Sequence, residues 1–242
     1  MKRPARLALA VCAGAVVAAA AAPAAGAALR PHNSQRLSNE RTLTRWASPV
    51  RNAVIRSSAS GHAHGVARLH AFTEDGFPEV YVALRSRLAG GRLWIRVRIP
   101  KRPNGRSGWV PRNALGPLHA VTTALRIDKR RSRATLLRRG RVVWHSRIGH
   151  GAPGTPTPSG RFYIRERLDN HGGDPTYGPW AFGTSAYSRL SDWPGGGVIG
   201  IHGTDQPWLI PGRPSHGCIR IPNPAIRRLA RLMPVGTPVR IR

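Results

Sequence analysis

The feature that most limits the fold of this chain is a series of short apolar runs separated by glycine and proline. The 242 residues include 27 glycines and 22 prolines, and both residue types interrupt helices and mark turns. The run from Leu93 to Ile99 alternates apolar with basic or bulky residues at a period of two, which is typical of a half-buried strand. Because such runs occur along most of the chain, the sequence predicts a mainly β protein.

The first 27 residues have the pattern of a secretory signal peptide. Lys2, Arg3 and Arg6 precede an apolar run from Leu7 to Ala22, and small residues follow it as far as Ala27. The apolar run is shorter than the roughly 20 residues that a membrane-spanning helix needs. We therefore expect export to the periplasm or cell wall, a signal peptide over 1–27 and a polar linker over 28–44. Retention of the signal as a membrane anchor remains an alternative.

The cysteine content draws attention to one residue. The chain has two cysteines, and Cys12 lies in the expected signal peptide, so the exported protein keeps only Cys218 and forms no intramolecular disulfide. A lone thiol in an oxidising compartment is a chemical liability unless it has a use. Cys218 is therefore either a reactive nucleophile or an inert buried residue, and composition alone does not separate the two.

The chain is strongly basic, with 39 Lys and Arg residues, 10 Asp and Glu residues and a formal net charge of +29. Such a charge attracts polyanions. The basic residues are scattered, no nucleic-acid motif is present, and export separates the protein from nucleic acid. We therefore expect anionic cell-wall polymers, and not nucleic acid, as partners. A GC-rich genome is an equally good explanation of the arginine content.

Residues 45–118 are predicted to form a first, small β unit. Its last part, WIRVRIPKRPNGRSGWVPRNAL at 94–115, resembles the closing strands of a bacterial SH3-like domain. The resemblance implies a small β-barrel that binds or positions the cell wall and takes no part in chemistry.

Residues 119–242 are predicted to form a second unit, again mostly strand. The turn at Arg139 and Gly140 separates two strand-like runs, which predicts a hairpin. A buried-looking strand ends at His202. Near the C-terminus, Asn223 is expected to cap a short helix with Pro224 at its first position.

Candidate chemistry is concentrated in two segments of this unit, IHGT at 201–204 and SHGCIR at 215–220. The free pKa of a thiol is about 8.5, so a catalytic cysteine needs a base or a positive neighbourhood. His202, His216 and Arg220 are the candidates near Cys218. Gly217 would let a ligand approach the backbone, where amides can stabilise an oxyanion.

These two segments resemble the active-site signature of the L,D-transpeptidase catalytic domain, also called the YkuD type. GTPTPSGRFYI at 154–164 and GTPVRI at 236–241 are similar to other parts of that domain. The resemblance implies a β-sandwich-like catalytic domain with a short C-terminal helix, and it implies that no metal or organic cofactor is needed.

The resemblance also implies roles for individual residues. Cys218 would attack the carbonyl between the third and fourth residues of a peptidoglycan stem peptide, release the terminal D-alanine and form a thioester. His202 would be the general base, held by a backbone carbonyl near Gly203. Backbone amides around His216, Gly217 and Cys218 would form the oxyanion hole, and an amine of a neighbouring stem would complete a 3→3 cross-link. Carbapenem β-lactams are expected to acylate Cys218.

Other motif positions have less definite roles. Ser215 and Arg220 are expected to shape the site or to contact a substrate carboxylate, although Arg220 could instead brace the loop through an ion pair. Tyr177 and Trp180 precede the catalytic strand and are expected either to line a substrate lid or to pack in the core.

Several alternatives remain beside the transpeptidase. An L,D-carboxypeptidase or endopeptidase would use the same thioester but pass it to water. A non-catalytic, basic wall-binding protein would not need both His202 and Cys218. In papain-like peptidases the cysteine precedes its histidine in the chain, unlike the order here. Zinc binding by His202, His216 and Cys218 fits no common ligand spacing.

Overall fold

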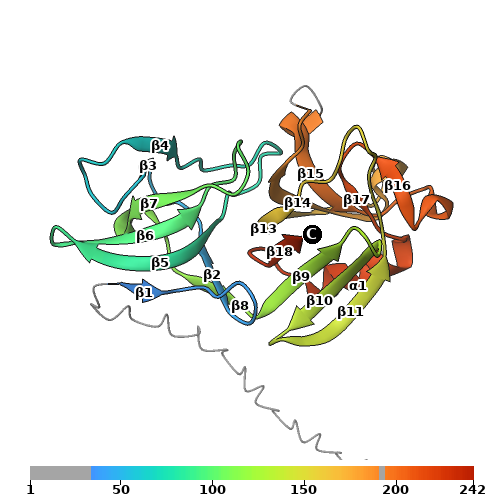
Figure 1. Ribbon diagram of the computed structural model, residues 1–242, viewed down its shortest axis with the longest axis horizontal. Helices are drawn as coiled ribbons and strands as arrows, with labels where there is room; N and C mark the ends of the chain where they lie inside the picture. The colour runs from blue at the N-terminus through green and yellow to red at the C-terminus, as the bar shows by residue number, and fades with distance from the viewer. Residues whose placement is uncertain (1–33, 191–193) are drawn as a thin grey trace, which may run out of the picture.

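The computed structural model describes residues 34–190 and 194–242. It consists of two β units that lie side by side, with the C-terminus inside the unit formed by the second half of the chain (Figure 1). The expected signal peptide and residues 28–33 lie outside the described residues. Within the described residues, no helix is long and apolar enough to cross a bilayer.

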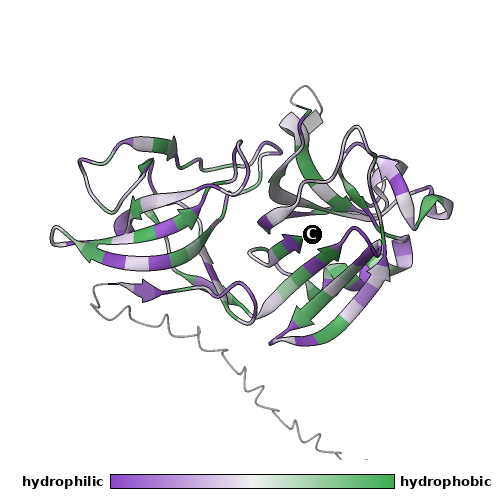
Figure 2. Ribbon diagram, in the orientation of Figure 1, coloured by the Kyte–Doolittle hydropathy of each residue, from purple (hydrophilic) through white to green (hydrophobic). Residues whose placement is uncertain are grey.

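The first unit is an eight-stranded sheet with the order β4-β3-β7-β6-β5-β2-β8, and β1 pairs with β5. Hydrophobic and hydrophilic bands follow one another along β5 (Figure 2), as expected for a strand with one face buried. The strands are β1 (Gln35–Arg36), β2 (Thr44–Ala47), β3 (Val54–Arg56), β4 (Gly65–Arg68), β5 (Tyr81–Ala89), β6 (Arg92–Arg98), β7 (Ser107–Pro111) and β8 (His119–Val121), with a 3₁₀ turn at Arg112–Ala114.

The first unit extends beyond both of its predicted ends. Residues 34–44 are not a linker, because β1 pairs with β5 and Leu37 is 1% exposed within the core of the unit. Ser38 is buried beside it and donates a hydrogen bond of 2.5 Å to the Ala83 carbonyl, so this polar-looking segment is fixed on β5. At the other end, β8 pairs with β2, so the unit extends beyond residue 118 to Val121. The SH3-like resemblance of the unit stays a prediction.

The second unit is a ten-stranded sheet with the order β11-β10-β9-β18-β13-β14-β15-β17-β12-β16. Its strands are β9 (Thr123–Asp128), β10 (Arg133–Arg138), β11 (Arg141–Arg147), β12 (Gly149–Gly151), β13 (Gly160–Asp169), β14 (Trp180–Tyr187), β15 (Val198–His202), β16 (Gly212–Ser215), β17 (Ile219–Arg220) and β18 (Pro238–Ile241). Three 3₁₀ turns lie at Pro175–Tyr177, Pro194–Gly197 and Pro207–Leu209.

The local predictions for this unit are confirmed except for the helix cap. β10 and β11 form the expected hairpin around Arg139 and Gly140, which both have positive φ angles. Helix α1 (Asn223–Leu232) is the α-helix of the described residues, but its N-cap is Pro222. Asn223 does not cap it, because its Oδ1 accepts a hydrogen bond of 2.9 Å from the Thr204 N–H. That contact fixes the segment that follows His202.

An apolar cluster joins the two units. Tyr163 on β13 is fully buried, packs with Val80 and Val82 of the first unit, and donates a hydrogen bond of 2.9 Å to the Val80 carbonyl. Trp46 also meets the second unit, at Gly236, where an added Cβ would lie 2.0 Å from the Trp46 ring. Only glycine lets the Trp46 ring approach the backbone this closely. The φ of Gly236 is +81°, a value that glycine adopts more readily than other residues.

A buried ion pair crosses the same interface. The side chains of Arg165 on β13 and Glu79 of the first unit are 2% and 1% exposed, and Arg165 Nε donates to Glu79 Oε1 at 3.0 Å. Arg165 also donates to Glu74 Oε2 at 2.8 Å and to the Tyr187 hydroxyl at 3.1 Å. The ion pair raises the pKa of the Arg165 guanidinium, against the effect of its burial. The segment 73–80 of the first unit is therefore fixed against β13 and β14.

Candidate active site

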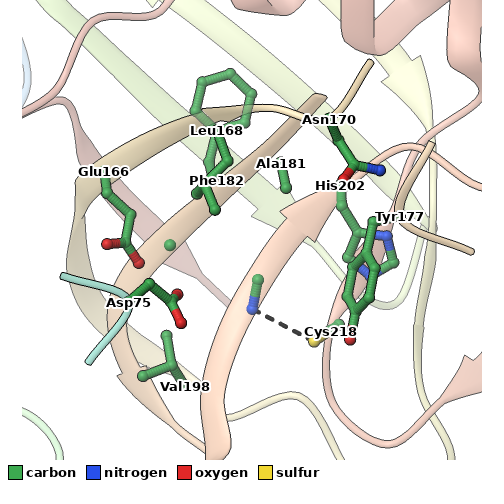
Figure 3. Close-up of a pocket in the computed structure, with 12 residues that line it drawn as sticks. Asp75, Glu166, Leu168, Asn170, Tyr177, Ala181, Phe182, Val198, His202 and Cys218 are labelled. Atoms are coloured by element: carbon green, nitrogen blue, oxygen red, sulfur yellow. Dashed lines mark hydrogen bonds between the residues drawn. The ribbon is translucent and has the colours of Figure 1, made fainter. Parts of the chain in front are cut away.

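A cavity of about 250 Å³ opens beside the central strands of the second unit. Figure 3 shows the Cys218 thiol and the His202 ring at one end, and two carboxylates at the other. The cavity is lined by Asp75, Glu166, Leu168, Asn170, Tyr177, Ala181, Phe182, Gly183, Val198, Gly200, His202 and Cys218. Most of these residues come from β13, β14 and β15, so the sheet itself forms one wall.

Sheet register brings His202 and Cys218 together. β15 and β17 pair in parallel, with Ile201 opposite Ile219 and His202 opposite Arg220. Cys218 directly precedes β17, which places it beside Gly200 on β15. The segment 203–218 is the crossover that a parallel pair requires, and it explains why sixteen residue positions separate the two side chains in sequence.

The His202 imidazole is held in one tautomer. Its Nδ1 lies 2.6 Å from the Gly203 carbonyl oxygen, and a carbonyl oxygen only accepts, so Nδ1 carries the hydrogen and Nε2 keeps its lone pair. Burial lowers the pKa of His202 to about 4, although the bond to Gly203 acts in the opposite direction. His202 is therefore a neutral base at physiological pH.

The Cys218 thiol is partly exposed and accepts a hydrogen bond of 3.3 Å from the Gly200 N–H. Burial raises the pKa of the thiol, while the Gly200 amide and the positive charge of Arg220 lower it to a smaller extent. Since the thiol pKa is raised and that of His202 is lowered, the resting pair is a neutral thiol and a neutral imidazole.

Gly200 keeps the space between these two groups open. A Cβ at this position would lie 3.6 Å from His202 Cδ2 and 3.7 Å from Cys218 Sγ. Both reactive side chains therefore border the same small space, and a reacting carbonyl can reach them together.

The turn before Cys218 differs from the expected oxyanion hole in one respect. The Gly217 N–H donates to Ser215 Oγ at 3.2 Å, so this amide is engaged inside the protein. Ser215 Oγ donates in turn to the Cys218 carbonyl at 2.6 Å, and Thr157 Oγ1 donates to the Gly217 carbonyl at 2.7 Å. The Cys218 N–H makes no hydrogen bond to any described residue, which leaves it available to an oxyanion.

Gly217 is required by the shape of this turn. Its φ is +128°, and an added Cβ would lie 2.8 Å from Ile199 Cδ1. Ser215 therefore braces the turn, and Gly217 allows it to pack on β15.

Arg220 and His216 lie at the margin of the site. Arg220 Nη1 donates to Gln206 Oε1 at 2.9 Å. No carboxylate of the described residues pairs with Arg220, so Arg220 braces the loop through a hydrogen bond to an amide and not through an ion pair. His216 is exposed and does not line the cavity. In the described part of the chain, no group of His, Cys, Asp and Glu side chains is arranged to hold a metal ion, and this includes His202, His216 and Cys218.

The two aromatic candidates have different positions. Tyr177 lines the cavity, and its ring meets that of His202 edge to face, with centroids 5.0 Å apart. Trp180 does not line the cavity. It packs against the core of the second unit, and the Arg167 guanidinium lies 5.2 Å from its ring centre.

Sequence reasoning missed the acidic end of the cavity, formed by Asp75 of the first unit and Glu166 on β13. Glu166 is 2% exposed and accepts a hydrogen bond of 2.5 Å from Thr73 Oγ1. Burial raises the pKa of Glu166 to about 7, and the nearby Asp75 carboxylate adds to the increase. No motif marks either residue, and Asp75 lies in a different unit from Cys218.

Comparison with known proteins assigns the second unit to a family. The family model of the YkuD type, the L,D-transpeptidase catalytic domain, matches residues 122–241. The protein YkuD of Bacillus subtilis (strain 168) is 37% identical over 107 residues, which are 44% of this chain and 58% of that protein. YkuD of Bacillus licheniformis is 37% identical over 106 residues, 44% of this chain and 57% of its own. The chain thus matches less than two thirds of the length of either relative.

Among solved structures, the catalytic domain from an E. faecium L,D-transpeptidase acylated by ertapenem is 27% identical to this chain. The match covers 51% of this chain and 99% of that domain, with a TM-score of 0.39. The family match begins at residue 122, directly after the last strand of the first unit, and it includes both His202 and Cys218. Residues 122–241 of this chain therefore belong to the YkuD family of L,D-transpeptidase catalytic domains.

Proposed function

We propose that this protein is a peptidoglycan L,D-transpeptidase that acts outside the cytoplasmic membrane and forms 3→3 cross-links through a thioester on Cys218. The observation that carries the proposal is the joint position of Cys218 and His202. Both border one cavity, and the His202 tautomer leaves Nε2 as the proton acceptor. The Cys218 N–H has no partner among the described residues and can stabilise an oxyanion, so the site supports an acyl-transfer reaction.

In the first half of the reaction, Cys218 Sγ attacks the carbonyl carbon between the third and fourth residues of a donor stem peptide. The thiol proton passes to His202 Nε2, and the Cys218 N–H stabilises the oxyanion. When the tetrahedral intermediate collapses, the C–N bond breaks, the amine of D-alanine takes the proton from His202 and leaves, and an acyl thioester remains.

In the second half, an amine of a neighbouring stem attacks the thioester carbonyl. His202 takes a proton from that amine and returns it to the departing sulfur, so that the thiol is regenerated and a new amide bond forms. An L,D-carboxypeptidase or endopeptidase would complete the same cycle with water as the acceptor.

The test is intact-mass spectrometry of the exported form of the protein incubated with ertapenem, beside a Cys218→Ala variant. Opening of the β-lactam ring breaks an amide bond without releasing a fragment, so one adduct with the full mass of the drug is expected. The adduct is expected on the parent protein and at least 1000-fold less on the variant, because the nucleophile itself is absent.

Purified tetrapeptide muropeptides then test the reaction. Dimers that have lost one D-alanine support the transpeptidase, whereas tripeptides alone would assign the carboxypeptidase. A folded parent protein that forms neither adduct nor product would refute catalysis and favour a wall-binding protein.

The acidic end of the cavity favours an amine as the acceptor. Two of the ten acidic residues of this basic chain, Asp75 and Glu166, line the same cavity as the nucleophile. A side-chain amine is protonated in solution, with a pKa near about 10.4. The Asp75 carboxylate, and Glu166 in its ionised form, therefore attract an ammonium group, whereas neutral water gains no such attraction.

Replacement of Asp75, which is exposed, by Asn is expected to lower the ratio of cross-linked to hydrolysed product roughly fivefold, which corresponds to about 1 kcal/mol for an exposed charge pair. The rate of acylation by ertapenem should change little. The readout is chromatographic separation of dimers and tripeptides. Asp205→Asn is the matched control, because Asp205 is exposed and does not line the cavity. An unchanged product ratio in Asp75→Asn would contradict a role for this end of the cavity.

A further inference from the structure

Three arginines form a row across neighbouring strands of the second unit. In the register of the sheet, Arg126 on β9 lies opposite Arg240 on β18, and Arg240 lies opposite Arg161 on β13. All three are exposed. Their sequence neighbours Leu125 and Val239 are buried in the core, so the arginines project from the opposite face of the sheet.

The row has no internal charge partner. Adjacent strands lie about 4.8 Å apart, so three guanidinium side chains start within roughly 10 Å of one another. Like charges directly opposite each other destabilise a sheet. In the described part of the chain no carboxylate pairs with Arg126, Arg161 or Arg240, so no ion pair among those residues offsets this repulsion.

The row also lines a cavity of about 330 Å³ between the two units. Arg41 of the first unit and Arg242 at the C-terminus add to its wall. Glu40 is the carboxylate among its lining residues, and both of its oxygens accept hydrogen bonds from Arg98, at 2.5 and 2.7 Å. A concave surface with one sign of charge concentrates the electrostatic field and attracts counter-ions.

We propose that the row of Arg126, Arg240 and Arg161 binds a linear phosphodiester polymer of the glycerol-phosphate type. Guanidinium groups bind phosphate oxygens in a bidentate manner, and a polymer with one phosphate in each repeat presents successive charges to successive arginines. A single small anion would neutralise only part of the row.

The position of the row suits a tether that leaves catalysis free. Arg161 and Glu166 lie on the same strand, β13, five residues or about 17 Å apart. A polymer bound at Arg161 therefore holds the protein near the wall without entering the cavity of Cys218.

A second arginine row exists on the first unit, where Arg36 lies opposite Arg85 and Arg85 opposite Arg96. The shallow surface there is lined by residues of the first unit alone, and Arg96 Nε already donates to Ser107 Oγ at 3.0 Å. Because the inter-unit cavity presents arginines from two units to one ligand, it is the stronger site.

The experiment measures binding of a fluorescent glycerol-phosphate oligomer to the full exported chain by anisotropy at increasing NaCl. The variant combines Arg126→Gln, Arg161→Gln and Arg240→Gln. Each phosphate contact contributes about 0.7 to the slope of log affinity against log salt for a flexible chain. The variant is therefore expected to bind at least tenfold more weakly at about 0.1 M salt, with a slope smaller by about 2.

The matched control combines Arg227→Gln, Arg228→Gln and Arg231→Gln, which removes the same charge from exposed positions on α1. Its affinity should fall less than threefold. Equal losses in the two triple variants would overturn the proposal, because net charge would then explain binding. If affinity falls only in a triple variant that combines Arg36→Gln, Arg85→Gln and Arg96→Gln, the polymer binds to the row on the first unit and the proposal is overturned. If the first triple variant fails to fold, Arg240→Gln alone should lower the slope by about 0.7, and an unchanged slope would overturn the proposal.

Discussion

Replacement of Glu79 by Ala is expected to lower the free energy of unfolding by about 3–5 kcal/mol, the cost of leaving a buried charge without its partner. The Arg165 side chain is 2% exposed and cannot turn into solvent without opening the contact between the two units. Glu74 also binds Arg165 but is 36% exposed, so it compensates only in part. Urea unfolding followed by tryptophan fluorescence measures the effect.

Two further variants show whether charge is the cause. Asp205→Ala removes an exposed carboxylate and should change stability by less than about 0.5 kcal/mol. The double variant Glu79→Leu with Arg165→Met removes both charges and should recover most of the loss, because an apolar pair of similar volume replaces the ion pair. A loss below about 1 kcal/mol in Glu79→Ala would contradict a buried ion pair as the principal contact between the units.

Local features of the fold could be predicted from the sequence. The alternation from Leu93 to Ile99 identified β6, and the turn at Arg139 and Gly140 identified the β10–β11 hairpin, because strand periodicity and turn geometry depend on neighbouring residues. The role of residues 34–44 could not be predicted. Leu37 is buried only because β1 pairs with β5, about fifty residues away, and no local pattern encodes that pairing.

The reactive pair could also be predicted, because His202 and Cys218 lie in a compact motif whose spacing the β15–β17 crossover requires. The acidic end of the cavity could not. Asp75 reaches the cavity through the contact between the two units, which includes the Arg165–Glu79 pair, and that pair joins residues 86 positions apart. The acidic end of the cavity therefore depends on the contact between the two units, whereas the position of His202 and Cys218 depends on the pairing of β15 with β17.

Replacement of His202 by Ala is expected to slow acylation of Cys218 by ertapenem by about 10²- to 10⁴-fold, the usual contribution of a general base. The resting pair is neutral, so His202 acts by accepting the proton during attack and does not maintain a thiolate beforehand. Alkylation by iodoacetamide, which depends on the thiolate population, should therefore change less than about threefold in the same variant. Stopped-flow fluorescence and mass spectrometry measure the two rates.

The pH dependence follows from the same pair. Burial lowers the pKa of His202 to about 4, and only the neutral imidazole accepts a proton, so acylation by ertapenem should be lost as the pH falls through about 4. A solvated histidine would lose it near about 6.5. His216→Ala is the matched control, since His216 is exposed, and it should slow acylation less than tenfold. A parallel loss of acylation and alkylation in His202→Ala, or an acid limb near pH 6.5, would instead indicate a thiolate–imidazolium pair in the resting protein.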